Sequence, residues 1–149
     1  MDWHKGEYNH IINLYRMVVA AHPQDIDAYE NAGWLLWSMN RDDEALAFYQ
    51  QGLRANPNKA DMYEDIGQLY ANRKKDYQTG IRYLEKAYAL PGGNPMRGHA
   101  LAHAYEHAGR NADALKVWTR LARNPNDGAA RHNLARLKRK MNERPAGRG

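Results

Sequence analysis

Four of the six prolines in this chain recur at a constant interval. They stand 34 residues apart, at Pro23, Pro57, Pro91 and Pro125. A fixed period of about 20–50 residues indicates a repeat architecture, in which each repeat is one supersecondary unit. Such a unit buries its apolar face only by stacking on its neighbours. The proline period therefore predicts that most of the 149 residues form one stack of similar units.

Two further series of residues follow the same period, with one exception. Residues at the first position are Ile11, Ala45, Gly80 and Ala114. Residues at the second position, which are larger, are Tyr15, Tyr49, Leu84 and Trp118. Both series step by 34, 35 and 34 residues. We infer that one residue is inserted in the unit that ends near Pro91.

The apolar spacing inside a unit indicates two helices. One helical stripe of the first full unit is formed by Tyr29, Ala32, Gly33 and Leu36, and a second by Ala45, Phe48, Tyr49 and Gly52. Short polar connections at 40–43 and 108–111 separate the paired helices. The sequence therefore predicts an all-α solenoid of antiparallel helix hairpins.

The unit resembles the tetratricopeptide repeat (TPR), which carries W-x2-L-G-x2-Y, then A-x3-F, then P. One copy reads Tyr29-x2-Ala32-Gly33-x2-Leu36, then Ala45-x3-Tyr49, then Pro57. The next two copies end at Pro91 and Pro125, and in the last of them Gly98 stands where the pattern has an aromatic residue. The resemblance implies a right-handed superhelical solenoid with a concave groove.

The repeat boundaries divide the chain into six segments. Three full repeats are expected at 26–59, 60–94 and 95–128, the second of them with the inserted residue. A leading half repeat at 1–25 has only a second helix, from Tyr8 to Ala21. A capping helix at 129–141 and a flexible tail at 142–149 complete the chain. The leading helix is strongly apolar, and Trp3 or a second copy of the chain could cover it.

The TPR resemblance implies that the first helix of each unit lines the groove. The residues expected there are Asp27, Glu30, Trp34, Trp37, Asp61, Glu64, Gln68, Asn72, His99, His103, Glu106 and His107. Lysines and arginines fall mostly on second helices and connections, Arg73 among them, although the formal net charge is +5. The sequence thus predicts an acidic groove that binds another protein or a peptide, with preference for basic and apolar segments.

Trp34 and Trp37 are the strongest binding candidates, because exposed indoles bury a large area and donate a hydrogen bond. Packing between neighbouring first helices is the alternative for either residue. One subset of the family grips acidic chaperone tails with lysine, asparagine and arginine. Here Glu30 and Trp34 stand at the positions of the lysine and the asparagine in the first full unit. Met96 and Ala100 replace the two basic residues that this subset carries two units later, so an acidic chaperone tail is disfavoured as the ligand.

His99, His103 and His107 share one helical face and are the only cluster that suggests metal chemistry. A rise of about 1.5 Å per residue puts the outer two about 12 Å apart, so all three cannot hold one ion. Structural and catalytic zinc sites use three or four protein ligands. We therefore expect no physiological metal site and no cofactor.

Other functions find little support in the sequence. The chain has no cysteine and no motif for a nucleophile or a phosphate-binding loop, so we expect no catalytic residue and no enzyme. Nucleic-acid binding through the basic cap and the Arg73–Lys75 connection is an alternative that charge alone supports weakly. No membrane-spanning stretch or secretory signal is recognisable, so we expect a cytoplasmic protein.

Overall fold

The computed structural model describes residues 3–143, with side chains from residue 6 onward, and every regular element in this range is helical. The helices are α1 (Trp3–Ala21), α2 (Ile26–Ser38), α3 (Asp42–Ala55), α4 (Ala60–Gln68), the π-helical turn η1 (Leu69–Arg73), α5 (Tyr77–Ala89), α6 (Arg97–His107), α7 (Asn111–Leu121) and α8 (Gly128–Asn142). No helix within 3–143 combines the length and the apolar character that crossing a bilayer demands.

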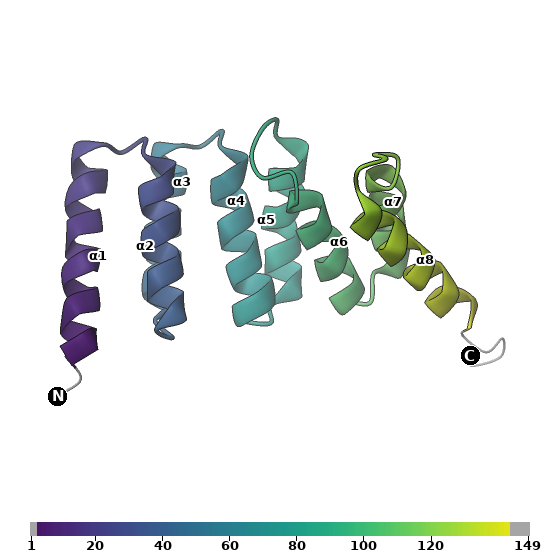
Figure 1. Ribbon diagram of the computed structural model, residues 1–149, viewed down its shortest axis with the longest axis horizontal. Helices are drawn as coiled ribbons and strands as arrows, with labels where there is room; N and C mark the ends of the chain where they lie inside the picture. Colours follow the sequence, from purple (N-terminus) through teal and green to yellow (C-terminus); the bar gives the residue numbers. More distant parts are fainter. Residues whose placement is uncertain (1–2, 144–149) are drawn as a thin grey trace.

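The helices stand side by side along the long axis of the molecule, with α1 and α8 at opposite ends (Figure 1). Hairpins α2–α3, α4–α5 and α6–α7 are the most closely packed pairs of neighbours. The predicted all-α hairpin solenoid is confirmed. Helix α1 begins at Trp3, earlier than the expected Tyr8. The Trp3 side chain and residues 144–149 of the expected tail lie outside the described part.

Glycines allow the helices of a hairpin to touch. A Cβ atom added at Gly33 would lie 2.2 Å from Tyr49 Cε1. At Gly80 it would lie 2.9 Å from both Gly67 O and Ala71 N, which are main-chain atoms. The backbones of α4 and α5 are therefore in direct contact, which explains the small residues of the repeat.

The inserted residue is absorbed by a π-helical turn. First-helix positions Gly33 and Gly67 are 34 residues apart, whereas second-helix positions Ala45 and Gly80 are 35 apart, so the extra residue lies between 67 and 80. Helix α4 widens there into η1. A π turn accommodates one additional residue without breaking the helix, and such turns often occur at functional sites.

Equivalent turns connect the two helices within each hairpin, and aspartate side chains cap the starts of several helices. Asn40, Lys75 and Gly109 occupy the same place in successive hairpins and have φ values of 60°, 56° and 76°. At the starts of α2 and α5, Asp25 and Asp76 accept a hydrogen bond from a backbone N–H group three residues ahead. The lysine is the only one of the three turn residues that carries a long side chain in a left-handed conformation.

Candidate functional site

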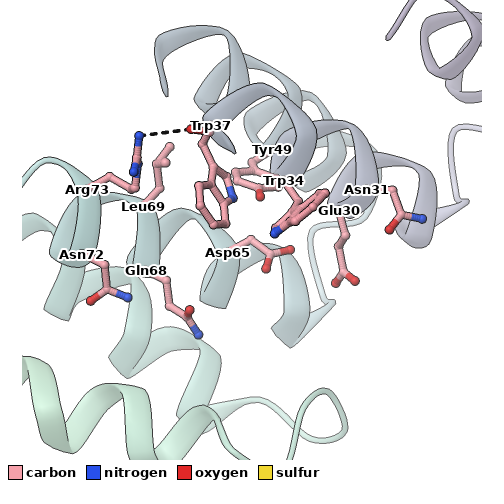
Figure 2. Close-up of a pocket in the computed structure, with 10 residues that line it drawn as sticks. All are labelled: Glu30, Asn31, Trp34, Trp37, Tyr49, Asp65, Gln68, Leu69, Asn72 and Arg73. Carbon is pink, nitrogen blue, oxygen red and sulfur yellow. Dashed lines mark hydrogen bonds between the residues drawn. The ribbon is translucent and has the colours of Figure 1, made fainter. Parts of the chain in front are cut away.

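A cavity of about 400 Å³ lies between α2 and α4 (Figure 2). Its walls come from four elements: α2, α3, α4 and η1. The lining residues are Glu30, Asn31, Trp34, Trp37, Tyr49, Asp65, Gln68, Leu69, Asn72 and Arg73. We call this hollow the indole cavity.

A second hollow of about 360 Å³ lies between α4 and α6. It is lined by Glu64, Gln68, Asn72, Leu84, Asn94, Met96, Ala100, His103 and His107. Gln68 and Asn72 belong to both hollows. The two hollows are therefore adjacent, and we call them together, over α2, α4 and α6, the groove.

The two tryptophans differ in how freely their rings can be reached. Trp34 is 57% exposed, and its ring meets Trp37 edge to face at 6.1 Å between centroids. The Arg73 guanidinium lies 5.2 Å from the centroid of the half-buried Trp37 ring and donates to Trp37 O at 3.1 Å, the bond dashed in Figure 2. Trp34 therefore offers the larger free indole surface.

Carboxyl groups gather where α2 faces α4. Burial, followed by the charge of Glu30, raises the pKa of Asp65 to about 9. The carboxyl groups of Glu30 and Asp65 lie close enough to influence each other's pKa, and two such neighbouring carboxyl groups favour one proton between them. Asp65 Oδ2 is buried and receives no hydrogen bond from an N–H group. Asp65 is thus protonated at neutral pH, so the groove is less negative than its formal charges suggest.

The side chains of Glu64 and Asp61 form hydrogen bonds inside the protein, next to the groove. Glu64 is only 4% exposed, and Gln68 Nε2 donates to its Oε1 at 2.8 Å. Burial, followed by the charge of Asp61, raises the pKa of Glu64 to about 7. Asp61 Oδ1 accepts a hydrogen bond from the Asn94 backbone at 3.0 Å. These two carboxyl groups hold the 90–96 connection against α4.

The three histidines occupy three different environments. His99 is 6% exposed and hydrogen-bonds to Asp127, with 2.7 Å between Nε2 and Oδ2. His103 meets the Trp118 ring edge to face at 5.0 Å, and burial lowers its pKa. His107 stacks on Tyr77 at 5.4 Å. Only His103 and His107 line the groove.

Glu106 belongs to a buried network between helices. Its Oε2 accepts hydrogen bonds from Trp118 Nε1 at 2.9 Å and from Arg136 at 2.8 Å. This carboxylate therefore links α6 to α7 and α8. Within the described range, no three side chains of the ligand types histidine, aspartate and glutamate are grouped to hold a metal ion.

The structure brings together some expected groove residues and adds others. Glu30, Trp34, Trp37, Gln68 and Asn72 all line the indole cavity. Asp27 is exposed in the first turn of α2 and does not line either hollow. Asn31, Tyr49 and Leu69 also line this cavity and were not among the expected binding residues. Tyr49 is buried as a core residue should be, yet one face of it forms part of the cavity wall.

One expectation about charge was wrong. Arg73 was assigned to a connection away from the groove, but it lines the indole cavity. It lies in η1 and is paired with Asp42, with 2.9 Å between Nη2 and Oδ1. Lys74 is likewise paired with Asp43 at 2.7 Å. The one-residue insertion was the sequence signal for this change, because the π turn alters which residues of the first helix face α2.

Comparisons with known proteins place the chain in a family. Residues 26–59 and 95–137 match two sequence models of the tetratricopeptide repeat. The chain belongs to the tetratricopeptide repeat family. No curated protein matches it in sequence.

Several solved structures have the same fold. MamA is 17% identical, with a TM-score of 0.74 over 93% of this chain and 81% of MamA. YrrB, described as a TPR protein with an unusual peptide-binding site, is 25% identical, with a TM-score of 0.70 over 85% of this chain and 66% of YrrB. The first TPR of Spaghetti (RPAP3), solved with the HSP90 peptide SRMEEVD, is 20% identical, with a TM-score of 0.67 over 76% of this chain and 93% of that one.

Proposed function

We propose that the groove binds an extended segment of another polypeptide that carries a lysine or arginine next to apolar or proline residues. The observation that supports this function is the indole cavity, in which the exposed Trp34 ring lies beside the carboxyl groups of Glu30 and Asp65. Membership in the TPR family supports a general role in binding other polypeptides, since some proteins of this fold bind peptides.

The groove offers a separate contact for each part of such a segment. The Trp34 face can pack on apolar side chains, and a cation over an indole contributes about 0.5–2 kcal/mol. Gln68 and Asn72 run along both hollows, and their amide groups can donate to and accept from a peptide backbone. Carboxylates beside the indoles favour basic partners mainly by raising association rate and selectivity.

Acidic ligands such as the SRMEEVD peptide of the Spaghetti complex should bind poorly here. Glu30 and Trp34 replace the lysine and asparagine that the chaperone-tail subset of the family uses. Arg73, which lines the cavity, is already paired with Asp42 and packed on Trp37. An acidic segment would therefore meet uncompensated carboxyl groups.

Substitution of Trp34 tests where the segment binds. In a peptide panel followed by tryptophan fluorescence, Trp34→Ala should weaken binding of basic, proline-containing peptides at least about tenfold. Met17→Ala is the matched control, because Met17 is 68% exposed on α1 and lies outside both hollows. Equal affinities of Trp34→Ala and the wild type would rule out the indole cavity as the binding site.

A second candidate function is self-association through α1. Leu14 and Val18 are 47% and 36% exposed. Their equivalents one unit later, Phe48 and Gly52, are buried. The exposed stripe therefore has the character of an interface, and we propose that a second copy of the chain covers it. Sedimentation velocity should show dimers that Leu14→Lys abolishes; a concentration-independent monomer would contradict this.

The expected lack of catalysis and the expected cytoplasmic location are also proposals. The family repeats support the former, because the fold serves as a binding scaffold. Cell fractionation would test the latter.

A further inference from the structure

The carboxyl groups that gather where α2 faces α4 take part in no ion pair within residues 6–143. Ion pairs in the described part of the chain hold Asp42, Asp43, Glu44, Glu85, Glu106, Asp113 and Asp127. None of these ion pairs involves Glu30, Asp61, Glu64 or Asp65. These four carboxyl groups of α2 and α4 therefore have no lysine or arginine at ion-pair distance.

The charged and titratable groups around Asp65 come from every element that packs on it. They are Glu30 from α2, Tyr49 from α3, Asp61 and Glu64 from α4, and Arg73 from η1. Arg73 is the one cation in this group, and its guanidinium already donates to Asp42, Asn40 and Trp37. None of these surrounding groups donates an N–H hydrogen bond to the buried Asp65 Oδ2 atom.

We propose that the indole cavity is the subsite for one lysine or arginine side chain of the bound segment, and that this cation replaces the proton shared by Glu30 and Asp65. The inference rests on the groove being a peptide-binding site. Figure 2 shows the carboxyl groups of Glu30 and Asp65 on the same side of the cavity, near the Trp34 ring. An ammonium or guanidinium placed there would meet two carboxylates and the face of an indole.

The exchange balances in charge and in hydrogen bonds. The free cavity holds one proton between two carboxyl groups, so the pair carries a single negative charge. The entering cation donates to both carboxylates, Asp65 Oδ2 included, and the proton leaves to solvent. A lysine or arginine side chain has several N–H donors for this purpose. A neutral glutamine can donate to the pair but has no charge with which to displace the proton.

Proton release makes binding depend on pH in a definite direction. Burial and the Glu30 charge keep Asp65 protonated at neutral pH, since they raise its pKa to about 9. The affinity for a lysine-containing segment should therefore rise with pH, approaching tenfold per pH unit between about pH 6 and 8. The lysine itself stays charged there, as its ordinary pKa is about 10.4. His103, in the neighbouring hollow, has a pKa that burial lowers from the ordinary histidine value.

Titration calorimetry on the full chain measures the exchange directly. The probes are two blocked peptides of proline, leucine and alanine that differ only in a central lysine or glutamine. Each is titrated at neutral pH in two buffers of different ionisation enthalpy. We expect the lysine peptide to release about one proton and the glutamine peptide none. Asp65→Asn, which keeps a donor to Glu30, should release none with either peptide, and its fold is checked by circular dichroism.

The outcomes separate this inference from the proposed function. Binding of the lysine peptide by the wild type without proton release would overturn the exchange and leave the groove assignment standing. Equal release from the wild type and Asp65→Asn would also overturn it, because the proton would then come from another group. Failure of both peptides to bind would overturn the groove assignment as well.

Discussion

Gly80→Ala is the substitution for which the structure gives the sharpest stability prediction. Gly80 lies in the first turns of α5, where that helix crosses α4. The new methyl carbon would stand 2.9 Å from Gly67 O, 2.9 Å from Ala71 N and 3.0 Å from Ala71 Cβ. Carbon atoms essentially never come this close to main-chain atoms, and main-chain atoms cannot rotate away. The two helices must therefore move apart.

The magnitude follows from two opposing effects. Alanine in place of glycine stabilises a helix interior by about 1 kcal/mol. Overpacking a core costs about 1–3 kcal/mol, and we take the upper end because the contacts at Gly80 are to backbone. The net expectation is that Gly80→Ala lowers the free energy of unfolding by about 2 kcal/mol.

Urea unfolding followed by far-ultraviolet circular dichroism tests this value. Gly6→Ala is the control, because Gly6 lies in α1 and a Cβ atom there meets nothing within 4 Å. It receives the same gain in helix propensity without the collision, so it should be more stable than the wild type by about 0.5–1 kcal/mol. If Gly80→Ala unfolds at or above the wild-type urea midpoint, the close contact of α4 and α5 is wrong.

Three further predictions concern stability. Gly67→Leu should unfold at a lower urea concentration than Gly92→Leu, because a Cβ atom at Gly67 would lie 2.7 Å from Leu84 Cγ. A Cβ atom at Gly92 has open space around it, and only the φ of 75° is unfavourable there. Equal urea midpoints of the two variants would contradict this prediction. Lys75→Gly should raise the free energy of unfolding by about 1 kcal/mol, since Lys75 has a φ of 56°; a less stable variant would argue against that turn. The raised pKa of Asp65 means that the folded state holds a proton which the unfolded state loses above about pH 4, so wild-type stability should fall as pH rises toward 9. Asp65→Asn should make this fall smaller, since only the part due to Glu30 and Glu64 remains, and should exceed the wild type at about pH 8 by at least about 1.4 kcal/mol, one pKa unit. Parallel pH profiles in thermal unfolding would refute the assignment.

The fold could be predicted from the sequence because the same helix–helix contact recurs in each repeat with similar residues. Gly33, Gly67 and Ala102 are small wherever a second helix must approach, and all three are buried. A 34-residue period cannot be maintained by local propensity alone, so it reports the stacking of units. The expected first helices of the units, and hence five of the residues that line the indole cavity, follow from that register.

The remaining features depend on contacts that no period encodes. Arg73 reaches the cavity because the inserted residue is absorbed by η1, and the sequence shows the insertion without showing how the helix accommodates it. The protonated state of Asp65 results from burial against Glu30, which comes from another unit. His99 is removed from the groove by Asp127, 28 residues further along the chain. Each case is a long-range contact that the repeat pattern leaves open.

The preference of the groove for basic segments is the central claim, and one affinity ratio tests it. Two blocked peptides that differ only in a central lysine or glutamate are titrated into the protein at physiological ionic strength, with tryptophan fluorescence as the readout. We predict that the lysine peptide binds at least about tenfold more tightly, a difference of about 1.4 kcal/mol. Equal affinities, or tighter binding of the glutamate peptide, would contradict the claim.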